Sequence, residues 1–186
     1  MCRPTWPPCC ITDGGIVTLA VNTLGVLYIV ENGNAIQSMA DLAGRTIAAS
    51  GKGSTPEYAL RYLLSENGID PDTGVTIDWK SEHSECVAAL ASGAATIAML
   101  PQPFVTTAQA QSENLRVALD LTEEWDALQA DSETPSTLVT GVVVARADFV
   151  EEHPAAVEQF LTSYADSVDW VNDNTAEAAE LIGGYD

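Results

Sequence analysis

The sequence predicts an α/β fold with a mostly parallel, doubly wound sheet. Short apolar runs rich in β-branched residues alternate with segments whose apolar residues recur at helical spacing. Glycine or proline separates the two kinds of segment along most of the chain. Strands that alternate with helices in this way build one sheet with helices on both of its faces.

Seven strands are expected, each from a β-branched or apolar run. They cover residues 16–21, 26–30, 45–49, 75–79, 95–100, 115–121 and 138–145. The first two are separated by residues 22–25, Asn-Thr-Leu-Gly, whose composition favours a break between strands.

Helices are expected between these strands. They cover a short segment ending at Gly44, a helix from Ser54 or Thr55 to Gly68, residues 84–91 and 104–111, a short helix within 122–135, and a last helix that opens at Pro154. The helix at Ser54 has the clearest start. Ser54 and Glu57 have the spacing of a capping box, and Pro56 suits a first helical turn.

The charge of the chain excludes several partners. Seven Lys and Arg residues stand against 27 Asp and Glu residues, for a net charge of −20. Such a surface repels phosphate backbones and anionic lipids, so neither nucleic acid nor a membrane surface is an expected partner. No apolar run reaches the roughly 20 residues that span a bilayer. The first residues also lack the pattern of a signal peptide, so the protein is cytoplasmic or its export segment is missing from this sequence.

The cysteine and histidine residues predict neither a metal site nor an active site. The four cysteines are Cys2, Cys9, Cys10 and Cys86. Adjacent cysteines without a nearby histidine fit no zinc-ligand spacing, and Cys86 is expected on the buried side of a helix. His83 and His153 lie at expected helix starts, where polar surface residues are common. We therefore expect no metal, no cofactor and no catalytic residue, and we do not expect an enzyme.

The glycine loop before the helix at Ser54 is the first candidate binding site. Free backbone N–H groups and the positive end of a helix dipole suit an anion. Gly53 allows the backbone to come close to a ligand, while Ser54 and Thr55 add hydroxyl groups. Residues 50–55 match neither a Walker loop nor a dinucleotide fingerprint. On the local pattern alone, a capped helix with nothing bound is an equal alternative.

Two further loops follow expected strands. Gln102 lies between Pro101 and Pro103 at the carboxyl end of a strand, where ligands bind in open α/β sheets, and its amide both donates and accepts. A rigid turn is the favoured alternative for this loop. Residues 81–85 could line a cleft in the same way, although a solvated loop with helix-capping serines is favoured there.

Several segments together resemble one protein family in their order and spacing. They are residues 36–47, 53–57, 63–64 with 68–71, 88–93, 101–103 and 148–154. The chain resembles the nitrate, sulfonate, taurine and bicarbonate solute-binding proteins of ABC importers, a family that also holds binders of thiamine-pyrimidine precursors. The resemblance implies a two-lobed periplasmic-binding fold of type II, which holds a small solute between its lobes and delivers it to an ABC permease.

The resemblance also assigns the ligand-binding residues and the lobes. The expected ligand-binding residues are Asn22, Thr23 and Leu24 at the first crossing between lobes, Gly53, Ser54 and Thr55 at the anion-facing helix start, and Gln102 on the opposing loop. Residues 27–136 would form one nearly complete lobe. Residues 1–26 would be an aberrant N-terminus with a remnant of the other lobe, to which residues 137–186 return.

The resemblance implies a chain truncated at both ends, with one partial lobe. Its parent protein is expected outside the cytoplasm, as a periplasmic protein or a cell-surface lipoprotein. Residues 1–12 share no likeness with the family. Read one nucleotide out of register, their codons can encode a segment of the kind that relatives carry before the strand at 16–21. We interpret residues 1–12 as frame-shifted, with a genuine unrelated leader as the alternative.

The expected function is therefore the capture of a small, sulfonate- or nitrate-like anion. The absence of Arg near the candidate loops argues against a tightly held dianion. One alternative is a non-functional remnant that folds by self-association, because an open sheet edge and half-covered apolar faces favour a homo-oligomer. A second alternative is an enzyme related to pyrimidine-precursor synthesis, although the chain offers no Cys/His cluster. An effector domain of a transcription regulator would need a basic helix-turn-helix segment, which is absent.

Overall fold

The computed structural model describes residues 15–185. They divide into two compact units: residues 22–141 form one, and residues 15–21 and 142–185 form the other. Residues 1–12, with Cys2, Cys9 and Cys10, lie outside the described part, so the frame-shift interpretation stays a prediction. The expected lobe boundaries at 27 and 136 also stay predictions.

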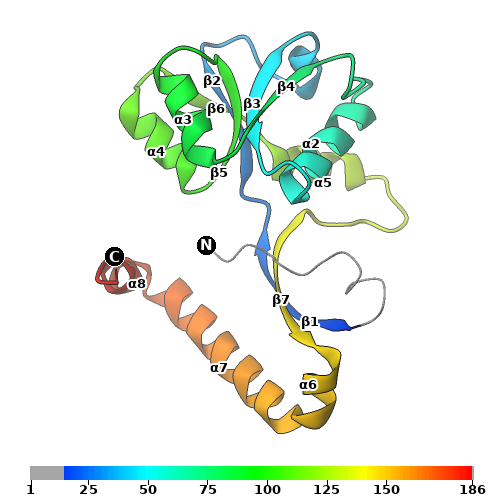
Figure 1. Cartoon of the computed structure of the whole chain (residues 1–186), viewed down its shortest axis with the longest axis vertical. Coiled ribbons are helices and arrows are strands. Elements are labelled where there is room, and N and C mark those ends of the chain that lie inside the picture. Colours follow the sequence, from blue (N-terminus) through cyan, green and yellow to red (C-terminus); the bar gives the residue numbers. More distant parts are fainter. Residues whose placement is uncertain (1–14, 186) are drawn as a thin grey trace. The chain divides into compact units, whose positions relative to one another are not determined.

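A five-stranded mixed sheet forms the centre of the larger unit, in the order β4-β3-β5-β2-β6 (Figure 1). The strands are β2 (Leu27–Asn32), β3 (Thr46–Ser50), β4 (Thr76–Lys80), β5 (Ile97–Pro101) and β6 (Leu115–Asp120). Strand β3 pairs in parallel with β4 and β5, whereas β2 pairs antiparallel with β5 and β6. The α/β class is confirmed, and the antiparallel insertion of β2 is a feature that the alternation of strands and helices did not reveal.

Helices cover both faces of this sheet. Helices α3 (His83–Ala91) and α4 (Phe104–Gln111) lie on one side, and α2 (Thr55–Glu66) and α5 (Leu121–Gln129) lie on the other (Figure 1). A short 3-10 helix, η1 (Met39–Leu42), packs with the second pair. The doubly wound arrangement is therefore confirmed for residues 22–141.

Each central strand contributes to both cores because successive side chains point to opposite faces. Ile29 packs in the core under α2 and α5, whereas its neighbour Val30 packs under α3 and α4. Met99 and Leu100 of β5 divide between the same two cores. Strands buried on both faces are nearly continuous apolar runs, which is the pattern that identified them in the sequence.

The buried carboxylate of Glu31, near the end of β2, forms an ion pair with Arg116, near the start of β6. The Glu31 side chain is 4% exposed, and the Arg116 Nη2 group donates to its Oε2 at 2.8 Å. The Glu31 carboxylate also accepts the backbone N–H groups of Ala35 at 2.8 Å and Ile36 at 3.2 Å. Arg116 donates further to the Gly33 and Ile36 carbonyls. This network ties the chain that leaves β2 to the start of β6.

The smaller unit has a much smaller core. Strands β1 (Ile16–Leu24) and β7 (Val139–Arg146) form a two-stranded sheet, of which residues 16–21 and 142–146 belong to this unit. The helices α6 (Ala147–Glu152), α7 (Pro154–Asp173) and α8 (Thr175–Gly183) follow. Among the described residues of this unit, only Val157 and Ala178 are buried apolar residues. No helix in residues 15–185 is long and apolar enough to cross a membrane.

Several boundaries differ from the expected ones. Strand β1 continues through Asn22 to Leu24, so the expected break at 22–25 is reduced to Gly25 and Val26. Pairing with β7 supplies the hydrogen-bond partners that keep these polar residues extended. The sixth strand ends at Asp120, whose side chain accepts the Thr122 N–H at 2.8 Å and thereby starts α5.

We expect Arg116→Met to lower the free energy of unfolding by about 3 kcal/mol, because it leaves a buried carboxylate without its counter-charge. Arg61→Met is the matched control. Arg61 is as accessible as Arg116 and also lies 2.8 Å from a carboxylate, but its partner Asp72 is 70% exposed whereas Glu31 is 4% exposed, so we expect a loss below about 1 kcal/mol. Urea unfolding of both variants measures the difference, and equal losses would contradict a stabilising role for the buried pair.

Candidate functional site

The carboxyl edge of the five-stranded sheet brings together the loops that carry most of the candidate residues. Strands β3, β4, β5 and β6 end at this edge, and β2 begins there, because β2 pairs Leu27 with Pro101 and Tyr28 with Asp120. The segment after β3 carries Gly53, and the segment after β5 carries Gln102. The two candidate loops therefore follow neighbouring strands at one end of the sheet, while their role in binding a ligand stays a prediction.

The glycine loop and the start of α2 do not form the expected capping box. Ser54 is the N-cap residue, but its hydroxyl donates to the Gly51 carbonyl at 2.6 Å instead of capping the helix. The Ser54 N–H also donates to the Gly51 carbonyl, at 3.1 Å. The capping-box prediction was therefore wrong, because a tight turn through the glycine loop takes both groups of Ser54.

The backbone N–H group of Gly53, which the sequence analysis expected to face a ligand, donates a hydrogen bond to the Glu57 carboxylate. Glu57 Oε2 accepts the Gly53 N–H at 2.6 Å. Gly53 has a φ of +79°, and a β-carbon there would meet nothing within 4 Å, so the loop faces open space at this point. The Glu57 carboxylate therefore already accepts a hydrogen bond from the loop. An anionic ligand at Gly53 would have to share this N–H group with Glu57 or displace the Glu57 carboxylate from it.

Two other groups of the loop remain available for a ligand. The Thr55 hydroxyl has no hydrogen-bond partner within the described part of the chain, and Lys52 has neither a hydrogen bond nor an ion pair there. Lys52 is exposed next to Gly53. The loop thus offers a hydroxyl and a positive charge beside the carboxylate of Glu57.

The Gln102 side chain is positioned by α4. Its Oε1 atom accepts the Thr106 N–H at 3.4 Å and the Thr106 hydroxyl at 3.0 Å. The Gln102 backbone N–H donates to the Val26 carbonyl at 3.1 Å, which fixes the loop to the start of β2. The carboxamide oxygen is therefore used within the protein, and the side-chain NH2 group is the part left to donate to a ligand.

Asn22, Thr23 and Leu24 lie on β1 and not in an open turn. A β-carbon at Gly141 of β7 would lie 2.5 Å from Asn22 Oδ1 and 2.7 Å from Thr23 Oγ1, so both side chains lie against β7. Leu24 is 54% exposed. No side-chain hydrogen bond in the described chain joins these residues to the loops at Gly53 and Gln102, and their ligand-binding role stays a prediction.

His83 is a candidate that the sequence analysis treated as an ordinary surface residue. It is the first residue of α3, and its Nδ1 atom lies 2.5 Å from Oγ of Ser50, the last residue of β3. Its ring centroid lies 5.0 Å from that of Phe104, just after the Gln102 loop. His83 therefore connects the two candidate loops. The position of His83 just after an expected strand was the one feature of the sequence that pointed to a place at this end of the sheet.

Burial sets the protonation of this cluster. Burial lowers the pKa of His83, while the nearby Glu82 carboxylate acts against that shift. Burial also raises the pKa of the Cys86 thiol, opposed by a hydrogen bond with Ser50. Cys86 is fully buried one turn after His83, as the sequence predicted. Both shifts favour the neutral forms of the two side chains.

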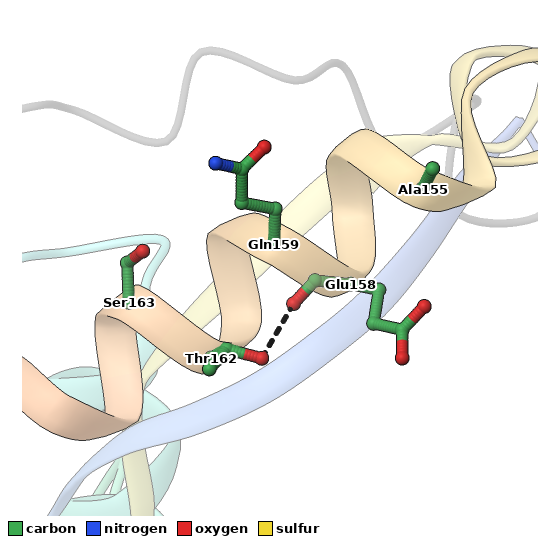
Figure 2. Close-up of a pocket in the computed structure, with 5 residues that line it drawn as sticks. All are labelled: Ala155, Glu158, Gln159, Thr162 and Ser163. Carbon is green, nitrogen blue, oxygen red and sulfur yellow. Dashed lines mark hydrogen bonds between the residues drawn. The ribbon is translucent and has the colours of Figure 1, made fainter.

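Ser54, Thr55 and Gln102 line none of the following three hollows on the surface of the described chain. One, of about 320 Å³, lies along α7 and is lined by Ala155, Glu158, Gln159, Thr162 and Ser163 (Figure 2). Its residues come from a single helix, and Thr162 donates to the Glu158 carbonyl at 3.0 Å (Figure 2). A hollow of about 350 Å³ lies beside Arg146 and Phe149. A polar hollow of about 520 Å³ includes Lys52 of the glycine loop and Glu57 of α2.

Residues 15–185 contain no group of three His, Cys, Asp or Glu side chains arranged to hold a metal ion. Besides Lys52, Glu57 and His83, the polar groups of the edge are hydroxyl, amide and backbone N–H groups. Groups of this kind are common in sites that hold a small polar molecule through hydrogen bonds.

Comparison with protein families decides the class of the chain. Residues 14–183 match the family model described as ABC transporter, phosphonate, periplasmic substrate-binding protein. The chain belongs to this family. The resemblance to ABC-importer solute-binding proteins is thereby confirmed. No curated protein matches the chain at the level of sequence.

Solved structures of the same kind share the fold. The periplasmic aliphatic sulphonate binding protein of Escherichia coli is 18% identical, with a TM-score of 0.73 over 94% of this chain and 56% of its own. The alkanesulfonate-binding protein of Xanthomonas axonopodis pv. citri, bound to MOPS, is 17% identical, with a TM-score of 0.64 over 92% and 56%. An ABC transporter protein of Parabacteroides distasonis is 20% identical, with a TM-score of 0.63 over 94% and 56%.

The chain thus spans little more than half the length of these substrate-binding proteins. At these identities the likeness establishes the fold, and it establishes no ligand. The family and the fold are those of transport proteins.

We expect His83 to titrate below the ordinary value of 6.5, because burial disfavours its charged form. Between this lowered pKa and pH 6.5 the unfolded chain binds more protons than the folded one. The free energy of unfolding should therefore fall as the pH drops below 6.5, and His83→Gln should remove this part of the pH dependence. Nuclear magnetic resonance titration of the imidazole checks the pKa, and a value above 6.5 would contradict the burial of His83.

Proposed function

We propose that this chain is the solute-binding part of an ABC importer and that its carboxyl edge binds a small anion. The observation that carries the proposal is the meeting of the glycine loop and the Gln102 loop at one edge of the sheet. Thr55, the Gln102 amide and the backbone of the glycine loop supply hydrogen-bond donors there. His83 connects the two loops through Ser50 and Phe104.

The solute that suits this edge is a monoanion such as an aliphatic sulfonate. Lys52 is the cation of the glycine loop, and no Arg lies in the loops that follow β3, β4 and β5. Glu57 adds a negative charge close to Gly53. A dianion needs charge-assisted donors such as paired Arg side chains, whereas a monoanion can be held by neutral donors and one positive charge. Two solved relatives of the same fold are sulfonate-binding proteins.

The parent protein that we propose delivers its solute to a membrane permease. Membership of a periplasmic substrate-binding family supports a location outside the cytoplasmic membrane. Asn22, Thr23 and Leu24 would complete the site from the segment in which β1 leads toward β2. We propose binding and no catalytic step, because the family and the fold are those of transport proteins.

We expect Thr55→Val to weaken ethanesulfonate binding by about 0.5–1.5 kcal/mol, the net worth of one neutral hydrogen bond. Valine has nearly the shape of threonine, and the Thr55 hydroxyl has no partner within the described chain, so stability should change little. Thr162→Val on α7 is the control, because it makes the same change far from the edge in sequence. Isothermal calorimetry measures both variants, and an unchanged affinity in Thr55→Val would contradict the assignment of Thr55.

We expect Glu57→Gln to strengthen ethanesulfonate binding about fivefold. The substitution removes a like charge beside the solute, worth about 1 kcal/mol in a solvent-exposed loop. Glu66→Gln removes the same charge from the last turn of the same helix and should leave the affinity unchanged. Weaker binding in Glu57→Gln would show instead that the Glu57 contact to Gly53 maintains the binding conformation of the loop.

A further inference from the structure

The chain carries far more negative charge than its own cations can neutralise. Its 27 Asp and Glu residues stand against seven Lys and Arg residues, so a net charge of −20 remains however these cations are placed. A net charge of this size destabilises the compact state, because folding brings like charges closer together. The balancing positive charge therefore has to come from ions in the solution.

The ion pairs of the described chain reduce this repulsion little. Glu31, Asp72, Asp78 and Asp148 each pair with a Lys or Arg side chain. Of these four carboxylates only Glu31 is buried, and the other three side chains are at least 50% exposed. An exposed pair contributes at most about 1 kcal/mol to stability. Pairing within the chain is thus a weak counterweight to the excess negative charge.

The excess is dense between residues 120 and 133, a segment that includes α5. The segment contains six Asp and Glu residues and neither Lys nor Arg. Glu123 and Asp126 are three residues apart on α5, which brings two like charges together on the helix surface. Burial raises the pKa of the Glu124 carboxyl, and the charge of the neighbouring Glu123 raises it further. The carboxylates of this helix therefore already repel one another.

The smaller unit combines the same excess with a small core. Residues 142–186 contain ten Asp and Glu residues and one Arg, Arg146, which is paired with Asp148. Among the described residues of this unit, Val157 and Ala178 are the buried apolar residues. Hydrophobic burial therefore opposes the repulsion less in this unit than in the larger one.

We propose that the fold of this chain depends on a high salt concentration, of the order of 1 M, which supplies the balancing charge. At about 1 M the Debye length is roughly 3 Å, against roughly 10 Å at about 0.1 M, so salt at that concentration screens most of the repulsion between exposed carboxylates. The protein is therefore suited to a strongly saline medium. The proposal concerns the whole surface and does not depend on the anion site.

The distribution of the charge favours ions in solution over a single bound partner. Carboxylates occur along the described chain from Glu31 to Glu180, on elements of both units. A basic protein that docked on one surface would neutralise only part of them. Residues 15–185 also contain no group of three His, Cys, Asp or Glu side chains that could hold a metal ion. Diffuse monovalent cations, in contrast, can reach every exposed carboxylate.

Thermal unfolding of the chain in KCl, followed by far-UV circular dichroism, tests the proposal. Between about 0.1 M and about 2 M KCl we expect the melting temperature to rise by at least about 10 °C, because screening removes the repulsion. A chain that is unfolded at the lower concentration and folded at the higher one would support the proposal equally. A rise below about 3 °C, or a chain that stays unfolded at about 2 M KCl, would overturn it.

Two double variants separate screening from a general effect of salt on apolar burial. Asp126→Asn with Asp131→Asn removes two charges from the segment at 120–133, which contains no Lys or Arg. We expect it to raise the melting temperature by about 3 °C at about 0.1 M KCl and to leave it unchanged at about 2 M. Asp72→Asn with Asp78→Asn is the matched control, because it removes two exposed charges that each pair with a cation, and it should give no rise. A rise of equal size at both salt concentrations, or in both variants, would contradict unpaired charge as the cause.

Discussion

The arrangement of the larger unit depends on one strand that runs against its neighbours. Strand β2 lies between β5 and β6 and is antiparallel to both, with Leu27 opposite Pro101 and Tyr28 opposite Asp120. This register brings the chain into the sheet at the edge where β3 to β6 end. Gly25 precedes it with a φ of +68°, and a β-carbon there would lie 2.0 Å from Thr122 Oγ1. Only glycine fits this position, so the approach to β2 and the start of α5 are packed together.

The electrostatics of the edge reflect the strongly acidic chain. With a net charge of −20, the protein repels anions at long range, so an anion can bind only where local donors outweigh the general field. In the site that we propose, the N-terminus of α2 and Lys52 would supply these donors. Glu57, however, already holds the Gly53 N–H. The loop is thus stabilised by its own carboxylate, and affinity for a solute depends on the competition between the two.

The sequence predicted the α/β class, most strands and helices, and the two loops of the candidate site, because these follow from local apolar patterns and glycine positions. It did not predict the direction of β2, which is set by pairing with distant strands. The capping box at Ser54 and Glu57 failed for a similar reason, since the turn at Gly51 offers Ser54 a nearer acceptor. His83 was missed because its contacts with Ser50 and Phe104 join residues far apart in the chain.

The most direct test of the proposed anion site is an amide correlation spectrum of the chain recorded during titration with ethanesulfonate. The account predicts that the backbone amides of Gly53 and Thr55 and the side-chain NH2 of Gln102 shift together and saturate with one dissociation constant. Resonances of α7, including those that line its shallow hollow, should stay unchanged. Saturable shifts confined to α7, or Gly53, Thr55 and Gln102 resonances that do not respond, would contradict binding at the carboxyl edge.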